Sequence, residues 1–158
     1  MGLFSIFKSK KNDVVNNDNY NNYPDDLKEW CISIDKYLPF WNESGKYLEE
    51  INKYYSLFIN NNLDETYFKE LINYCNKYIE LQPILNESRL EENRINKTNY
   101  PLPNSNIAYK KMILAYEKLQ DYKTAIALCE EAISKGYTND DTKGGYKERI
   151  EKLKNKLK

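Results

Sequence analysis

Apolar residues recur at helical spacing over the first half of the chain, once a polar opening segment has passed. From residue 25 to residue 38 they fall three or four positions apart, which predicts an amphipathic helix: Leu27, Trp30, Cys31, Ile34, Tyr37 and Leu38. Pro24 and the two aspartates after it are typical of a helix start. Pro39 is predicted to end this helix, because proline removes a backbone hydrogen bond. A second apolar stripe, from residue 47 to residue 59, predicts the next helix.

A third helix is expected after Asp64, with apolar positions from residue 67 to residue 79 and an end at Pro83. Residues 84–96 are more polar, and they continue as a further helix because proline is tolerated in a first turn. The run Tyr-Pro-Leu-Pro-Asn-Ser at residues 100–105 predicts an extended connector. This connector separates an aromatic-rich front half, residues 25–98, from the helices that follow it. Both tryptophans are predicted to anchor the core of the front half.

The clearest pattern lies between residues 106 and 137, where two short amphipathic helices are joined by a tight turn. Small residues stand where the two backbones would approach closely, namely Ala115, Ala125 and Ala132. Gly136 is a typical helix end. A final helix is predicted within residues 142–158 from apolar residues spaced by four, three and four: Tyr146, Ile150, Leu153 and Leu157.

The segment from residue 104 to residue 137 resembles a tetratricopeptide repeat, and residues 45–83, ending in Glu-Leu-Gln-Pro, resemble a degenerate copy of it. Leu71 and Ile113 depart from the family pattern, because both stand where small residues are usual. The resemblance implies an all-α fold of six or seven helices, stacked as antiparallel hairpins in a right-handed array with a C-terminal capping helix. Residues 25–158 would then be one domain behind a flexible leader, residues 1–24.

The resemblance also implies a function, since the first helix of each such hairpin lines a groove that holds peptides or helices of other proteins. Transferred to this chain, it predicts a partner-binding surface on one helix: Ile107, Lys110, Leu114, Glu117 and Lys118. Leu114 replaces the asparagine with which clamps for C-terminal carboxylates hold their ligand, so such a clamp is not expected. The competing interpretation is that these five residues are an ordinary solvated helix face.

The amino-acid composition limits the kinds of functional site that the chain is expected to form. The 158 residues contain no histidine, and three widely spaced cysteines form no CxxC pair, so neither a metal site nor a cofactor site nor a catalytic residue is predicted. Free thiols favour the cytoplasm. Lysine plus arginine and aspartate plus glutamate balance at 24 each, which argues against a nucleic-acid partner. Residues 142–145, Thr-Lys-Gly-Gly, are either a weak anion cradle or a turn.

The first eleven residues are apolar and then basic, with Leu3, Phe4, Ile6 and Phe7 followed by lysines. This head either docks in a groove, touches a membrane interface, or is a free terminus. We therefore expect a non-catalytic adaptor that binds a peptide or helix of another protein. The alternatives are a self-associating homodimer and, less favoured, peripheral membrane contact through the head.

Overall fold

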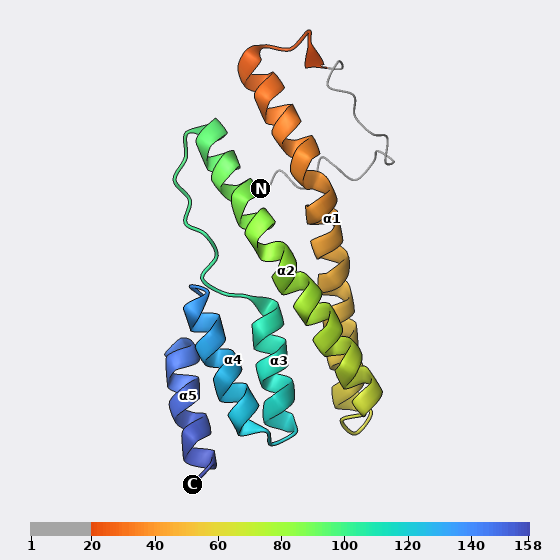
Figure 1. Ribbon diagram of the computed structural model, residues 1–158, viewed down its shortest axis with the longest axis vertical. Helices are drawn as coiled ribbons and strands as arrows, with labels where there is room; N and C mark the ends of the chain where they lie inside the picture. Colours follow the sequence, from red (N-terminus) through yellow and green to blue (C-terminus); the bar gives the residue numbers. More distant parts are fainter. Residues whose placement is uncertain (1–19) are drawn as a thin grey trace.

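The computed structural model describes residues 20–158, which form five α-helices in chain order (Figure 1). Their bounds are α1 (Asp25–Asn60), α2 (Glu65–Asn96), α3 (Ile107–Lys118), α4 (Tyr122–Ser134) and α5 (Gly145–Lys156). None of these helices is apolar enough over a sufficient length to cross a lipid bilayer. The predictions for the head and for most of the leader fall on residues 1–19, outside the described residues.

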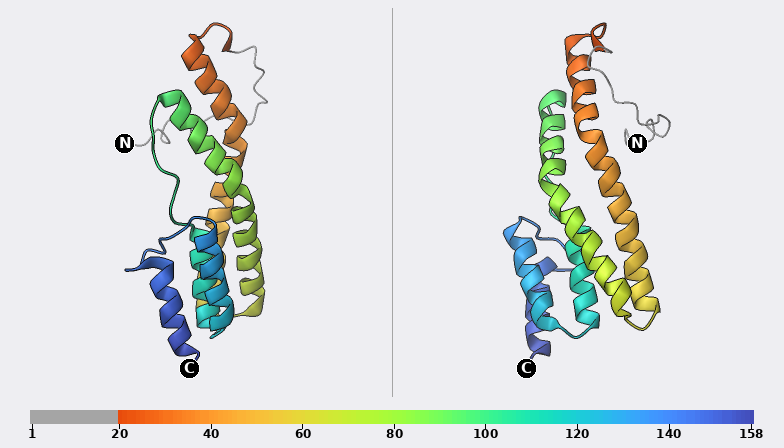
Figure 2. Two further views of the ribbon diagram at one scale, coloured as in Figure 1. Left: turned by 60° about the vertical axis from the view of Figure 1, so that its left-hand side comes forward. Right: turned by 45° about the vertical axis from the view of Figure 1, so that its right-hand side comes forward.

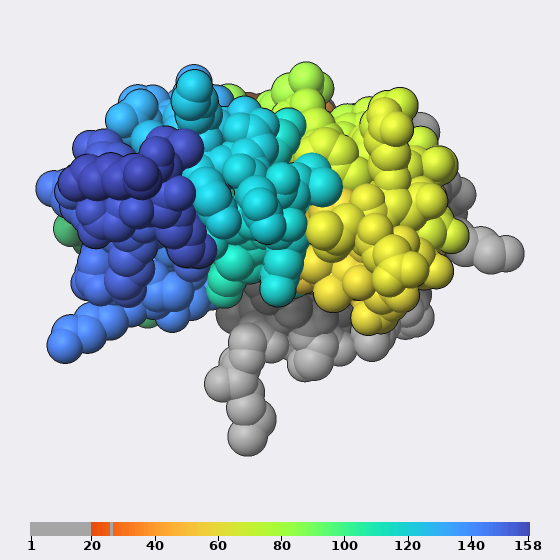
Figure 3. All heavy atoms as spheres, turned by 90° about the horizontal axis from the view of Figure 1, so that it is seen from below, coloured from red at the N-terminus to blue at the C-terminus, as the bar shows by residue number. Residues whose placement is uncertain are grey.

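The all-α prediction is confirmed, and successive helices pack against one another in antiparallel order. Helices α1 and α2 form one long pair, α3 packs against both of them and against α4, and α5 packs against α4. Viewed from below (Figure 3), α5, the α3–α4 hairpin and the turn between α1 and α2 lie side by side in a row. The long pair continues well beyond the three short helices, with the connector running back beside α2 (Figure 1).

Both proline predictions were wrong. Pro39 lies inside α1 and Pro83 inside α2, so the front half is two helices of 36 and 32 residues rather than four. A proline in a helix interior costs about 3 kcal/mol, but it can be offset by packing on either side of it. The two helices here contact one another over much of their length. Helix α2 still bends partway along (Figure 2).

The turn between the long helices is set by local backbone chemistry. Asn62 and Leu63 adopt left-handed conformations, with φ of 55° and 61°, which reverse the chain. Asp64 then caps α2, because its carboxylate accepts hydrogen bonds from the backbone N–H groups of Thr66 and Tyr67. The predicted start of this helix at Asp64 is therefore confirmed.

The hydrophobic core lies where all five helices meet, in the half of the molecule that holds the short helices. Its fully buried members include Ile51, Phe58, Leu71, Tyr109 and Tyr146. The three alanines predicted at close helix contacts are also completely buried: Ala115, Ala125 and Ala132. The outer halves of α1 and α2 contribute far less, with only Tyr37 and Leu85 buried between them.

Candidate functional site

A surface cavity lies between the outer halves of α1 and α2, away from the core. It has a volume of about 190 Å³, and we call it the α1–α2 groove; its lining residues are Trp30, Ser33, Ile34, Tyr37, Leu38, Trp41, Ser88, Arg89, Glu92 and Ile95. A shallower hollow continues it past Trp30 toward Leu27 and Asn96. The residues from α1 follow helical spacing, so one face of α1 forms one wall.

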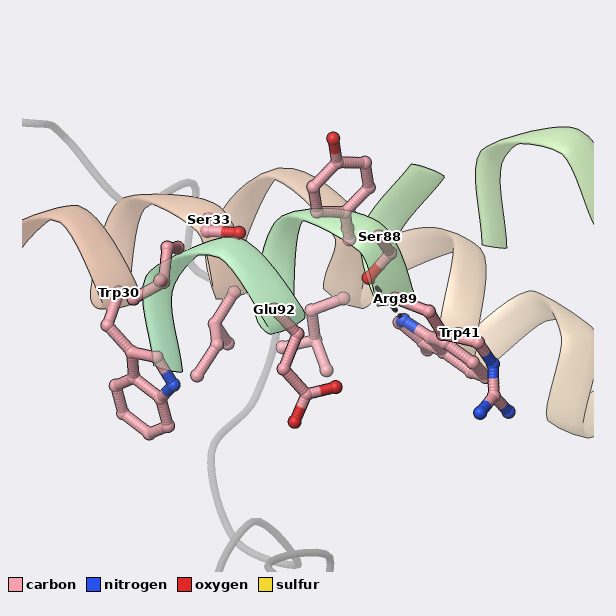
Figure 4. Close-up of a pocket in the computed structure, with 10 residues that line it drawn as sticks. Trp30, Ser33, Trp41, Ser88, Arg89 and Glu92 are labelled. Carbon is pink, nitrogen blue, oxygen red and sulfur yellow. Dashed lines mark hydrogen bonds between the residues drawn. The ribbon is translucent and has the colours of Figure 1, made fainter. Parts of the chain in front are cut away.

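Polar bridges, rather than a packed core, hold the two walls together. The hydroxyl of Tyr37 donates a hydrogen bond to Glu87 at 2.6 Å, and the ammonium of Lys36 binds the same carboxylate at 2.9 Å. The indole N–H of Trp41 donates to the hydroxyl of Ser88 at 2.9 Å (Figure 4). These contacts fix the separation of α1 and α2, and a cavity remains between the two helices.

The lining of the groove is largely aromatic and aliphatic. Figure 4 shows Trp30 and Trp41 near opposite ends of the groove, with Glu92 between them on the same side of the two helices. The guanidinium of Arg89 lies 5.1 Å from the Trp41 ring, a cation–π contact. Leu38, which lines the groove, is 37% exposed, so part of this apolar surface can be reached by an incoming group.

Charge is distributed unevenly along the groove. Arg89 stands at the Trp41 end, against the indole ring. Glu92 forms no ion pair with any residue from 20 to 158, whereas the neighbouring Glu91 pairs with Arg94. An occupant with a cationic end would therefore gain from placing that end near Glu92 and away from Arg89.

The tryptophans were not placed correctly by the sequence pattern. They were predicted as core anchors, but Trp30 and Trp41 are only partly buried and line the groove instead. The reason is that α1 continues past Pro39 and beyond the short helices, so that among the helices of residues 20–158 only α2 packs against its first half. A signal was present in the sequence, since two tryptophans and two leucines share one helical face of a polar chain.

The five predicted partner-binding residues all lie on α3, but two of them are engaged within the fold. Glu117 binds the guanidinium of Arg149 on α5, and Lys110 forms an ion pair with Asp141 in the loop before α5. Ile107 and Leu114 are partly buried, and Lys118 is exposed. Glu117 thus helps to attach α5, and the partner-binding role of this face stays a prediction.

The Thr-Lys-Gly-Gly segment is built as a structural turn. Gly144 and Gly145 have φ of 81° and 59°, and a side chain at Gly145 would collide with the carbonyl oxygen of Thr138. The hydroxyl and backbone N–H of Thr142 both donate to the buried carboxylate of Asp140. That carboxylate opposes a bound anion, so the geometry favours the turn over the anion cradle.

The three cysteine thiols of residues 20–158 are not activated as nucleophiles. Burial raises the pKa of the Cys75 and Cys129 thiols to about 12, so both stay protonated at neutral pH. Burial, with a smaller effect of Asp35, also raises the pKa of Cys31. No three Cys, Asp or Glu side chains in residues 20–158 lie close enough together to hold a metal ion.

Comparison of the chain with protein-family models, with curated proteins and with solved structures gives no match. The arrangement of the residues themselves must therefore indicate the function.

Proposed function

We propose that the protein is a non-catalytic protein-binding domain, which takes up a short apolar segment of a polypeptide in the α1–α2 groove. The observation that carries the proposal is an open, continuous apolar surface lined by both tryptophans of the chain. Tryptophan is the residue type most enriched among those that dominate binding energy at protein interfaces.

The open shape of the groove favours side chains over a cofactor. Small-molecule sites usually enclose most of the ligand's surface, whereas this cavity of about 190 Å³ opens into a shallower hollow of about 320 Å³. Such a shape suits two or three large side chains that enter in sequence from a peptide or from one face of a helix. The charges add a preference, because Glu92 favours a ligand with a lysine or arginine next to its apolar residues.

The finer fold assignment belongs to the same proposal. We take α1–α5 as tetratricopeptide-like hairpins, supported by the contact of α3 with both preceding helices and by the buried alanines of α3 and α4. In this arrangement α5 is the terminal cap. The surface on α3 would be a second contact area for a partner that extends beyond the groove.

A peptide-display selection against the full-length chain tests the proposal. We expect enriched sequences with basic residues next to two or three large apolar residues, and at least about tenfold weaker binding after Leu38→Asp, since this places an unpaired charge against the ligand. Ile32→Asp is the matched control, because Ile32 is also 37% exposed on α1 but does not line the groove. Equal loss in both variants, or no consensus at all, would contradict the proposal.

A further inference from the structure

We propose that the α1–α2 groove is occupied by the chain's own head, with residues 3–7 inserted between α1 and α2. The inference rests on the proposed function in one respect, namely that the groove accepts an apolar polypeptide segment. It goes further in naming the segment that fills the groove when no partner is present. The argument uses the chemistry of the head, the place where the described chain begins, and the charges along the groove.

The head has the composition that the groove selects. Four large apolar residues stand within five positions, Leu3, Phe4, Ile6 and Phe7, and they are followed by Lys8, Lys10 and Lys11. Elsewhere the leader is nearly all polar, so these residues are its main apolar group. Phenylalanine rings can pack against the two indoles in offset or edge-to-face geometry, which adds to the gain from burial.

The attachment point of the leader lies beside the groove. The hydroxyl of Tyr20 donates a hydrogen bond to Asp35 at 2.6 Å, and the ammonium of Lys28 binds the side chain of Asn21 at 3.1 Å. Asp35 directly follows Ile34, which lines the groove. The chain therefore leaves the described region at the level of the groove, around the side of α1.

The intervening residues are long enough to return to it. Residues 8–19 can span up to about 40 Å at about 3.3 Å per residue. The groove wall from Trp30 to Trp41 is only about 16 Å long at 1.5 Å per helical residue. No strained or fully extended conformation is needed.

Tethering makes even weak docking effective. A short tether gives an effective concentration on the order of 1 mM, so a segment with a dissociation constant of about 0.1 mM would be docked about nine tenths of the time. The charges also set a direction. The lysines that follow Phe7 would lie toward Glu92 and the Trp30 end, away from Arg89 at the Trp41 end.

Docking in cis has a functional consequence. A partner that uses the groove must displace the head, and its apparent affinity falls by the fraction of molecules in which the groove is free. The docked head thus competes with the partner for the groove. Once it is displaced, the apolar-basic head becomes available for a contact of its own.

Intrinsic fluorescence tests the inference directly, because both tryptophans of the chain line the groove. In the full-length chain, Phe4→Ser with Phe7→Ser should shift the emission to the red and raise acrylamide quenching about twofold, since both indoles lose their cover. Val14→Ser with Val15→Ser, in the same leader, is the matched control and should change neither. A peptide of residues 1–11, added in trans, should reverse the effect in the phenylalanine variant.

The remaining outcomes separate this inference from the proposed function. Equal quenching of wild type and phenylalanine variant, while the added peptide binds both in a Leu38-dependent manner, would overturn cis docking and leave the peptide-binding function standing. If the peptide binds neither chain, both cis docking and the proposed peptide-binding function are contradicted. Acrylamide quenching that depends on protein concentration would overturn cis docking and indicate a second copy as the occupant of the groove. Wild-type emission that changes with phosphatidylserine-containing vesicles would overturn it and indicate a membrane contact of the head.

Discussion

At the scale of single residues, the most constrained charges attach α5 rather than face a ligand. The side chain of Asp140 is fully buried, and its carboxylate binds the guanidinium of Arg149, which also binds Glu117 on α3. Two acids from different segments thus hold one arginine of α5. Removing one partner of such a buried set costs more than a surface pair contributes, because a desolvated charge loses its compensation.

Asp140→Asn should therefore lower the free energy of unfolding by about 1.5–3 kcal/mol, the range for hydrogen bonds to charged groups. Chemical denaturation followed by circular dichroism measures this change. Asp141→Asn is the matched control, since the neighbouring carboxylate is 61% exposed and its ion pair within residues 20–158 is with Lys110. It should cost about 0.5 kcal/mol or less. Equal losses of unfolding free energy in the two variants would show that the buried cluster stabilises the protein no more than the exposed ion pair does.

The same carboxylate makes stability depend on pH. Burial alone would raise the pKa of Asp140, but hydrogen bonds from Thr142 and Arg149 outweigh burial and hold the pKa below its ordinary value of 3.8. A depressed folded-state pKa stabilises the protein above the unfolded pKa, and this contribution is lost as pH falls through the folded value. The stability difference between wild type and Asp140→Asn should be constant near neutral pH and shrink below about pH 4. A difference that grows with acidification would contradict this assignment.

At the scale of the elements, the two internal prolines are exposed residues within continuous helices. Pro39→Ala should stabilise the protein by about 1–3 kcal/mol, because alanine restores a helical N–H and is the best helix former. Thermal unfolding of wild type and variant measures this gain in stability. Pro24→Ala, at the start of α1, is the control and should stay within about 0.5 kcal/mol of wild type. Destabilisation by Pro39→Ala would mean that α1 needs the proline to pack on α2.

The prolines also show what the sequence could and could not predict. Periodicity located most of the helical segments, because it depends on spacing within a few turns, and the resemblance to a repeat hairpin located the buried alanines. It could not predict the continuity of α1 and α2, which is decided by packing between segments about 50 residues apart, such as Tyr37 with Glu87. For the same reason Trp30 and Trp41 were assigned to the core. Amphipathic spacing gives the apolar face of a helix, but not whether a neighbour covers that face.

At the scale of the whole molecule, stability and recognition are separated along its length. The half with five helices contains the continuous core, whereas the outer half is two helices joined by polar bridges around an apolar groove. Regions with few buried apolar contacts open most easily. Adjustments in the spacing of α1 and α2 there would leave the core intact, which suits a surface that accommodates a segment and releases it.

This separation leads to a prediction about assembly. A groove covered in cis withdraws that apolar face of residues 20–158 from a second copy, and stable protein–protein interfaces usually bury about 1,200–2,000 Å². Sedimentation equilibrium should therefore give the monomer mass of 18.9 kDa for wild type at every concentration. Phe4→Ser with Phe7→Ser should uncover the groove and add a weak concentration-dependent dimer, which a further Leu38→Asp should abolish. A wild-type dimer that dissociates on Leu38→Asp would instead assign the groove to self-association and contradict cis docking.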